Sequence, residues 1–336
     1  MRKYRIITYG CQMNKADSER IMTDLENKGY SPASDIKEAD LIAVNMCSVR
    51  QSAVDRVYGL LPKFKELRKN KRLKTILTGC LLKKDSRKLR EGFDVITKKE
   101  SFLKCPPKYR KEKEAFLPIS NGCNNFCSYC VVPLTRGKLV CRDHKIIIKE
   151  AEKIIKKGVK EIWLLGQNVN DYQSPTKKTI NFPKLLRKIS DLPGNFSIRF
   201  VSSNPKNFSD ELIKTMADSE KIAKYLNLPV QSGDNKILKR MNRPYTAKQY
   251  KSLVSRIRNK MPNINLSTDV IVGFPGETES QFQNTAKLFK EIGFDIAYIN
   301  KYSPRPQTAA FLLKNNITQK EKKRRERILK KLVKHG

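Results

Sequence analysis

The first hundred residues alternate between short apolar runs of strand length and longer stretches in which apolar residues recur at helical spacing. The predicted strands are 4–9, 41–44 and 75–78. The predicted helices are 17–28, which ends at Gly29, and 52–70, which Pro62 is expected to kink. Strands that alternate with helices are typical of a parallel sheet with helices on both faces. We therefore expect an N-terminal doubly wound parallel-sheet domain of the α/β class.

A polar stretch that contains prolines then interrupts this pattern. Residues 102–114 include Pro106, Pro107 and a basic run, which is typical of an exposed linker. Six more strands are predicted after it, at 116–120, 161–165, 198–201, 225–230, 266–272 and 296–302. Amphipathic helices separate most of them, including 146–157, 247–261 and 279–292. Six βα units predict a parallel barrel or three-quarter barrel, with its active site at the C-terminal ends of the strands.

Residues 318–336 combine many basic side chains with a few apolar ones at helical spacing. The apolar ones are Ile328, Leu329, Leu332 and Val333. The pattern predicts a basic helix with one apolar stripe, which either binds an RNA backbone or packs its stripe and leaves the rest in water. The expected organisation is a domain over 1–108, a second domain over 109–317, and a basic C-terminal helix over 318–336.

The chain carries a formal net charge of +37, from 70 Lys and Arg against 33 Asp and Glu. So large an excess indicates a polyanionic partner, with nucleic acid as the leading candidate, although a solvated lysine-rich surface would give the same composition. No apolar stretch approaches the roughly 20 residues that cross a bilayer, and the N-terminus lacks the features of a secretory signal. We expect a cytoplasmic protein with no membrane partner.

Three of the eight cysteines lie close together after the strand predicted at 116–120. Cys123, Cys127 and Cys130 have CxxxCxxC spacing in a loop that contains Asn and Ser. Three such thiolates can hold three irons of a 4Fe-4S cluster and leave the fourth iron open. An open iron can bind the amino and carboxylate groups of S-adenosylmethionine, and an electron from the cluster then cleaves the sulfonium. Tyr129, next to the last cysteine, is suited to packing beside this cofactor.

Two other interpretations of this motif are weaker. A structural zinc site normally has four protein ligands, and the nearest further candidates are Cys141 and His144. Three cysteines of an apolar core would not be surrounded by a polar loop. The CxxxCxxC spacing is therefore the strongest single signal in the chain.

Cys11, Cys47 and Cys80 each follow the end of one of the three N-terminal strands by one to three residues. The ends of parallel strands lie side by side, so these thiols are expected to converge. They could then hold a second 4Fe-4S cluster, with an open iron to which sulfur can attach. Three separate buried cysteines are the alternative. Cys105 and Cys141 have no comparable setting, and we interpret both as structural or incidental.

Several segments resemble the methylthiotransferases of the radical S-adenosylmethionine superfamily, and the resemblance covers nearly the whole chain. These segments are 9–14, 17–19, 45–50, 78–80, 122–137, 165–169, 228–233, 269–277 and 303–306. Residues 11–14, 135–137 and 167–169 are most similar to the branch that forms 2-methylthio-N6-dimethylallyladenosine in tRNA. The resemblance implies an N-terminal cluster domain followed by a radical SAM partial (β/α)6 barrel.

The same resemblance implies a tRNA methylthiotransferase that uses two 4Fe-4S clusters and S-adenosylmethionine. One S-adenosylmethionine would methylate a sulfur at the N-terminal cluster, and a second would be cleaved at Cys123, Cys127 and Cys130. The radical would then allow a methylthio group to replace the C2 hydrogen of N6-dimethylallyladenosine at position 37, in the anticodon stem-loop of tRNA. A sulfur donor and a reducing electron donor are the other implied partners. The implied metal ligands are Cys11, Cys47, Cys80, Cys123, Cys127 and Cys130.

Glycines and polar residues after the barrel strands are expected to contact the cofactor. The glycines are Gly166, Gly233, Gly273 and Gly276. The hydrogen-bonding residues are Gln167, Asn168, Gln231, Ser232 and Asp269. Ordinary turn and cap roles after strands are the alternative for all of them. Arg136 could face a phosphate or a carboxylate, or form a surface ion pair.

The sequence departs from the family pattern at a few positions. Asn204 and Asn227 stand where histidine is common, and Gln307 stands where glycine is usual. Family members usually continue into a small all-β RNA-binding domain, the TRAM domain, whereas this sequence ends at Gly336. Other acceptors are N6-threonylcarbamoyladenosine and a ribosomal protein. A non-catalytic iron-sulfur protein that binds RNA is the alternative from another class.

Overall fold

The computed structural model describes residues 1–49, 51–97, 106–109 and 113–334. The chain forms two compact units: unit 1 contains residues 1–111 and 131–137, and unit 2 contains residues 112–130 and 138–336. The main boundary lies close to the expected one. Two segments are assigned differently from the expected division, because residues 131–137 fold with unit 1 and the basic C-terminal helix is part of unit 2. Cys105 lies outside the described residues.

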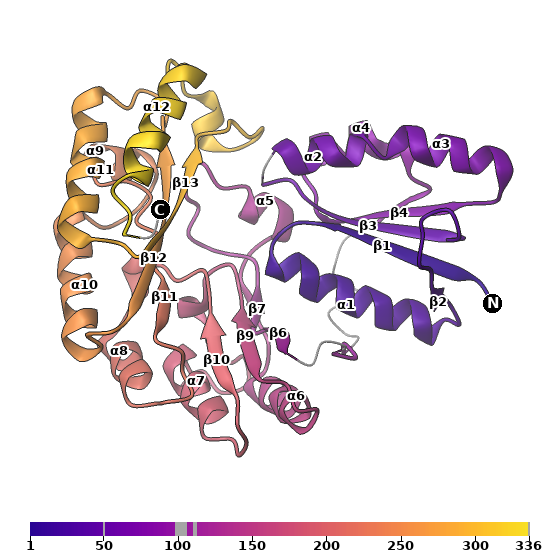
Figure 1. Ribbon diagram of the computed structural model, residues 1–336, viewed down its shortest axis with the longest axis horizontal. Coiled ribbons are helices and arrows are strands. Elements are labelled where there is room, and N and C mark those ends of the chain that lie inside the picture. The colour runs from indigo at the N-terminus through magenta and orange to yellow at the C-terminus, as the bar shows by residue number, and fades with distance from the viewer. Residues whose placement is uncertain (50, 98–105, 110–112, 335–336) are drawn as a thin grey trace. The chain divides into compact units, whose positions relative to one another are not determined.

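A five-stranded parallel sheet with the order β2-β1-β3-β4-β5 forms the centre of unit 1 (Figure 1). The strands are β1 (Lys3–Tyr9), β2 (Ser31–Pro32), β3 (Leu41–Cys47), β4 (Lys74–Cys80) and β5 (Val95–Ile96). The three long strands agree with the sequence prediction. The other two are only two residues long, too short to give a hydrophobic pattern. Every residue of β3 is buried, as in a strand that is covered on both faces.

Helices cover both faces of this sheet, with α1 on one side and α2, α3 and α4 on the other (Figure 1). They are α1 (Gln12–Asn27), α2 (Gln51–Tyr58), α3 (Leu61–Asn70) and α4 (Lys83–Leu89). Successive residues of β3 enter two separate cores: Val44 belongs to the core that includes Phe64, and Ala43 to the core that includes Ile21. This alternation confirms the doubly wound α/β domain.

Two predicted helices have other bounds in the structure. The helix predicted at 52–70 is two helices, α2 and α3, because Pro62 lacks the N–H of a helix interior and lies instead in the first turn of α3. The helix predicted from residue 17 begins at Gln12, since Met13 and Ala16 are already buried on its inner face.

Six parallel strands form the centre of unit 2, in two groups of three (Figure 1). The first group has the order β10-β9-β6, from β6 (Glu114–Pro118), β9 (Glu161–Leu165) and β10 (Ser197–Phe200). The second has the order β11-β12-β13, from β11 (Tyr225–Asn227), β12 (Asn265–Val272) and β13 (Ile296–Lys301). A parallel bridge between Ile198 and Ile222 extends the first group toward the second. This arrangement confirms the partial (β/α)6 barrel.

Helices connect the barrel strands. They are α6 (His144–Lys156), α7 (Phe182–Ser190), α8 (Asp210–Ala217), α9 (Asn235–Arg240), α10 (Ala247–Lys260) and α11 (Glu279–Ile292). The predicted helices among them are α6, α10 and α11, and each begins within two residues of its prediction. Thr246 and Thr278 form capping boxes at the starts of α10 and α11, which fixes those starts. A short antiparallel pair, β7 (Ser120–Asn121) and β8 (Val140–Cys141), follows β6, so the first barrel strand ends earlier than predicted.

The C-terminal helix α12 (Gln319–Lys330) packs into unit 2 through basic as well as apolar residues. The Nζ of the fully buried Lys322 donates to the carbonyl oxygen of Tyr302 at 3.2 Å. Arg325 forms an ion pair with Glu277 at 2.7 Å, with side chains 4% and 1% exposed. Of the predicted apolar stripe, Leu329 is buried. The inner face of this helix therefore has the packing role, and two of its basic residues share it.

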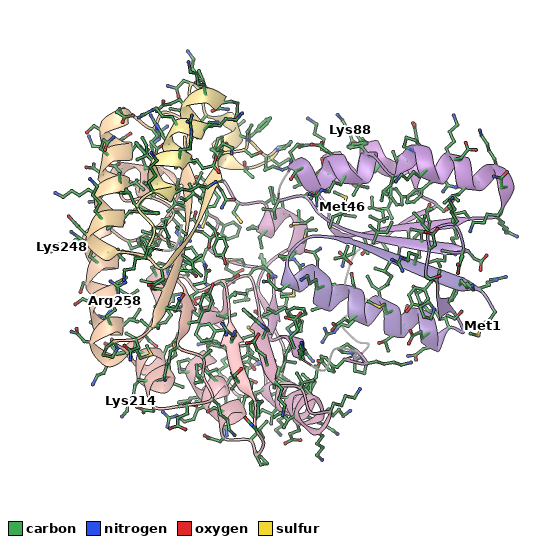
Figure 2. All side chains as sticks on the ribbon, in the orientation of Figure 1. Met1, Met46, Lys88, Lys214, Lys248 and Arg258 are labelled. Atoms are coloured by element: carbon green, nitrogen blue, oxygen red, sulfur yellow. The ribbon has the colours of Figure 1, made fainter. Side chains whose placement is uncertain are left out.

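Long side chains show where the excess positive charge lies. Met46 is fully buried inside unit 1, whereas Lys88, Lys214 and Lys248 are exposed at the outside of their units (Figure 2). Exposed lysines thus occur on both units. Within the described part of the chain, no helix combines the length and the apolar character that crossing a membrane requires.

Candidate iron-sulfur and cofactor sites

The three cysteines of the CxxxCxxC motif lie in an irregular loop of unit 2 after β7. Cys123, Cys127 and Cys130 are all half-buried. Within the loop, Phe126 has a left-handed backbone conformation (φ 45°), and the N–H of Cys130 donates to the carbonyl oxygen of Cys127 at 2.9 Å. Burial raises the pKa of the Cys123 thiol, and Cys127 adds to the rise. The loop thus gathers its thiols in a partly shielded position.

The turn after α9 holds this loop in place. The N–H of Ser128 donates to the carbonyl oxygen of Met241 at 3.0 Å, and its hydroxyl donates to that of Arg240 at 2.8 Å. The side-chain amide of Asn242 donates to the carbonyl oxygen of Phe126 at 3.0 Å. The position of the cysteines therefore depends on a segment more than a hundred residues away in the sequence.

Two hydrogen-bond donors face sulfur atoms of the loop. The guanidinium of Arg243 lies 3.6 Å from Sγ of Cys127, and Nδ2 of Asn125 lies 3.4 Å from Sγ of Cys123. Cysteine binds iron as a thiolate, and donors beside the sulfur favour that negatively charged state. Neither residue was predicted from the sequence as part of this site.

Arg243 is a buried cation. Its Nε donates to the hydroxyl of Tyr245 at 2.8 Å, and its second amino group donates to the carbonyl oxygen of Pro229 at 3.0 Å. Burial opposes its charge, but Tyr129 and Tyr245 raise its pKa above the usual value. No sequence pattern distinguishes this arginine from an exposed one near a helix end, which explains why it was missed.

Gly166, Gln167 and Asn168 follow β9, and they differ in what they contact. A Cβ on Gly166 would lie 2.6 Å from Oγ of Ser120, so this glycine permits a close approach within the fold. Oε1 of Gln167 accepts the N–H of Gly122 at 2.5 Å and thereby fixes the start of the cysteine loop. Asn168 is 2% exposed, and neither of its amide atoms has a hydrogen-bond partner among the described residues. Asn168 is thus suited to bind a ligand.

Ser232 and Gly233 pack against α11. The hydroxyl of Ser232 is fully buried and lies 3.3 Å from that of Thr285. A Cβ on Gly233 would lie 2.6 Å from Cα of the same threonine. Both residues therefore serve the packing of unit 2, and the cofactor contact expected of them stays a prediction. Gln231 is half-buried with φ 67° and forms a parallel bridge with Val270.

The remaining predicted cofactor residues lie around β12 and in the cysteine loop. Asp269 is half-buried and accepts a hydrogen bond from Nδ2 of Asn227 at 3.0 Å. Gly273 has φ 68°, and a Cβ there would lie 2.4 Å from Cγ of Lys322, so it makes room for that side chain. Its expected contact with a cofactor stays a prediction. Tyr129 packs on an apolar cluster that includes Phe274. Its expected place beside a cofactor stays a prediction.

Gly276 also lies close to a side chain of unit 2, and its expected cofactor contact stays a prediction. It has φ 72°, and a Cβ there would lie 2.9 Å from the guanidinium of Arg240. The close approach is again made by a side chain of unit 2.

The structure brings Cys11, Cys47 and Cys80 together in unit 1. Cys47 and Cys80 are register partners at the last positions of β3 and β4, so they end their strands and do not follow them as predicted. Oδ1 of Asn14 lies 3.5 Å from Sγ of Cys11 and 4.0 Å from Sγ of Cys80. The hydrogen bond with Cys80, burial and the nearby Cys11 raise the pKa of Cys47.

A buried polar network fixes this arrangement. Nδ2 of Asn14 donates to Oδ1 of Asn45 at 2.9 Å, and Nδ2 of Asn45 donates to Oγ of Ser18 at 3.0 Å. Gly10 and Gly79 lie beside this network, where a larger residue would not fit. A Cβ on Gly10 would lie 2.4 Å from Asn14, and one on Gly79, where φ is 117°, would lie 2.1 Å from a backbone oxygen of β3.

Arg136 reaches the same site from residues 131–137. Its Nε lies 3.1 Å from Sγ of Cys80, and a terminal amino group lies 3.2 Å from a carboxylate oxygen of Asp17. The side chain is 3% exposed, so this is a buried ion pair and not a surface one. Burial opposes the charge, but Cys80 and Asp17 raise the pKa of Arg136.

Neither set of cysteines is arranged to bind a single metal ion. Among the described residues, no group of three or more His, Cys, Asp and Glu side chains is close enough for that. The cysteines of an iron-sulfur cube bind different irons and need not meet at one point. The zinc alternative for Cys123, Cys127 and Cys130 would need such a group, and none is found among the described residues.

Comparison with known proteins gives matches over both units. Residues 117–289 match the radical SAM superfamily, and residues 3–98 match the uncharacterized protein family UPF0004. The tRNA-2-methylthio-N(6)-dimethylallyladenosine synthase of Alkaliphilus oremlandii (strain OhILAs) is 41% identical over 98% of this chain and 78% of its own length. The enzyme of the same name from Clostridium novyi (strain NT) is 41% identical over 95% of this chain and 78% of its own length.

Solved structures show a similar fold. The radical S-adenosylmethionine methyltransferase TsrM from Kitasatospora setae, with cobalamin and a 4Fe-4S cluster bound, matches with a TM-score of 0.67 and 14% identity, over 93% of this chain and 77% of that one. The apo form of the cobalamin-dependent S-adenosylmethionine radical enzyme OxsB matches with a TM-score of 0.66 and 12% identity, over 98% of this chain and 56% of that one. Together with the sequence matches, these findings show that the chain belongs to the radical SAM superfamily and, within it, to the family of tRNA-2-methylthio-N(6)-dimethylallyladenosine synthases.

Proposed function

We propose that this protein is a tRNA methylthiotransferase that places a methylthio group on C2 of N6-dimethylallyladenosine at position 37 of tRNA. The observation that carries the proposal is the presence of two separate sets of three cysteines, one in each unit, in a chain 41% identical to synthases named for this product. The charge of +37 suits a tRNA substrate. The proposal places the enzyme in the cytoplasm and requires a sulfur donor and a reducing electron donor as partners.

The residues of both sites fit a 4Fe-4S cluster. Each site offers three thiols, which leaves one iron of a cube without a protein ligand. Each also places a guanidinium beside one sulfur, Arg243 at Cys127 and Arg136 at Cys80. The buried amide of Asn168 has no hydrogen-bond partner among the described residues, so it offers S-adenosylmethionine a polar contact.

When bound, the two clusters supply the electron that cleaves S-adenosylmethionine and an iron that carries sulfur, which is the radical chemistry an unactivated aromatic carbon needs. The protein's own residues position these groups. Arg243 donates to the sulfur of Cys127, and Gln167 fixes the start of the cysteine loop. Oδ1 of Asn14 accepts from the thiols of both Cys11 and Cys80 and so holds them near one point.

Nucleoside analysis of tRNA tests this proposal. The chain is expressed in a host without its own methylthio activity, and tRNA nucleosides are examined by mass spectrometry. We expect 2-methylthio-N6-dimethylallyladenosine with the wild type and with Cys141→Ala, which lies outside both sets. Cys127→Ala and Cys80→Ala should each abolish the product.

Other outcomes would reassign the protein. A methylthio group on N6-threonylcarbamoyladenosine or on a ribosomal protein would change the acceptor but keep the reaction. If the intact protein forms neither a methylthio product nor 5′-deoxyadenosine, it is an RNA-binding iron-sulfur protein without this activity.

A further inference from the structure

Residues 131–137 follow the cysteine loop of unit 2 directly, yet they fold with unit 1. They form α5 (Val132–Arg136), which contacts β4. The chain therefore leads from Cys130, the last cysteine of one site, to a helix that ends at a residue touching Cys80 of the other. That residue is Arg136.

Cys80 and Asp17 are both partners of Arg136 at this site. Its Nε lies 3.1 Å from the sulfur of Cys80, and a terminal amino group lies 3.2 Å from Asp17. The side chains of Arg136 and Asp17 are 3% and 6% exposed, and Cys80 is 3% exposed. Electrostatic interactions in such a position are much stronger than at a surface, because water screens them little.

A purely structural ion pair would explain the contact of Arg136 with Asp17 but not its contact with Cys80. The ion pair with Asp17 accounts for a terminal amino group of Arg136. It leaves unexplained why Nε points at the sulfur. Hydrogen bonds to ligating sulfurs and the net charge around a cluster are the properties by which a protein sets the cluster's reduction potential.

We propose that Arg136 is a positioning residue for the cluster held by Cys11, Cys47 and Cys80. Its guanidinium donates a charged hydrogen bond to the sulfur of Cys80 and offsets the negative charge of the cluster. It thereby raises the reduction potential of that cluster. The inference rests on the proposed function, since it requires a cluster in unit 1.

The test measures this cluster alone. Cys123, Cys127 and Cys130 are all replaced by Ala, so that only the cysteines of unit 1 can assemble a cluster. Arg136→Gln, Arg136→Lys and Asp17→Asn are then introduced separately. Arg68→Gln is the matched control, because Arg68 forms an ion pair in unit 1 with Asp94 and hydrogen-bonds Thr75, at the opposite end of β4 from Cys80. Each variant is reconstituted anaerobically, and iron content, circular dichroism and an EPR-monitored redox titration are recorded.

We expect Arg136→Gln to make the cluster harder to reduce, with the reduction equilibrium shifted at least about tenfold, or about 59 mV for one electron. Arg136→Lys should keep the potential close to that of the wild type because it keeps the positive charge. Arg68→Gln should leave the potential unchanged, and Asp17→Asn should not lower it, since the cation remains. Loss of the cluster in a folded Arg136→Gln variant, with retention in Arg136→Lys, would also support the proposal.

Other results overturn it. An assembled cluster with unchanged potential in Arg136→Gln would leave Arg136 with the structural role only. The same follows if the cluster is lost from folded Arg136→Gln and Arg136→Lys alike, or if Asp17→Asn reproduces the shift. Failure of the proposed function looks different, because then no cluster assembles even with Arg136 intact.

Discussion

Neighbouring residues in this protein can look alike in sequence and have different roles in the structure. Gln167 and Asn168 both follow β9, but the first fixes the cysteine loop and the second has a buried amide with no partner in the described chain. Ser232 and Gly233 also follow a strand, and they pack on α11. Residue type and position after a strand predict that a group lies near the site. They do not predict whether the fold has already used its hydrogen-bonding capacity.

Replacing Asn168 should separate ligand binding from stability. Asn168→Leu keeps the approximate shape and removes an unsatisfied amide, so the free energy of unfolding of the metal-free protein should not fall. The affinity of the reconstituted protein for S-adenosylmethionine should fall about tenfold, equivalent to about 1.4 kcal/mol. Chemical denaturation and calorimetric titration measure the two quantities.

Asn204 provides the control for that experiment. It is buried in the same unit, and its side chain accepts the N–H of Lys206 as a cap. Asn204→Leu should therefore cost about 1 kcal/mol of stability. A loss of similar size in Asn168→Leu, with unchanged ligand affinity, would show that Asn168 is structural.

At the scale of elements, the ends of β3 and β4 decide whether the N-terminal cysteines meet. Gly79 has φ 117°, and a Cβ there would lie 2.1 Å from the carbonyl oxygen of Met46. Gly79→Ala should destabilise unit 1 by about 3 kcal/mol or more and reduce its iron content after reconstitution. Gly29→Ala is the control, because Gly29 also has positive φ (82°) but open space around it, and about 1–2 kcal/mol of strain is expected there. Equal losses in the two variants would refute the steric explanation.

Lys322 of helix α12 should make the free energy of unfolding depend on pH. Burial lowers the pKa of Lys322, so the unfolded chain binds its proton more readily than the folded one. The free energy of unfolding should then rise as the pH increases from the folded-state pKa toward the usual value near 10.5. Lys322→Met should remove this rise in urea denaturation between about pH 7 and 10. Lys323→Met, an exposed neighbour, should keep it. The same slope in Lys322→Met as in the wild type would contradict the assignment.

Elements with a clear hydrophobic periodicity could be predicted from the sequence. Segments whose position depends on contacts with residues remote in sequence could not. The pattern gives the long strands of both units and helices α6, α10 and α11 because their periodicity or caps are local. It places Cys11, Cys47 and Cys80 near the same sheet edge. It does not assign residues 131–137 to unit 1, because Arg136 is held by Cys80 and Asp17, both remote in sequence. For the same reason it misses Arg243.

At the scale of the whole molecule, the charge of +37 predicts how RNA binding responds to salt. If several phosphates are contacted, affinity for tRNA should fall on the order of a hundredfold or more between about 50 and 200 mM salt. Fluorescence anisotropy with labelled tRNA measures this dependence. A flat response would mean that the exposed lysines of the two units do not bind the RNA backbone.

The central claim is that each set of three cysteines holds its own iron cube. Iron analysis with Mössbauer spectroscopy of anaerobically reconstituted protein tests it most directly. We predict about eight irons per chain in two 4Fe-4S clusters, and about four when either Cys11, Cys47 and Cys80 or Cys123, Cys127 and Cys130 are replaced by Ala. A wild-type protein with only four irons, or with zinc in either set, would contradict the account.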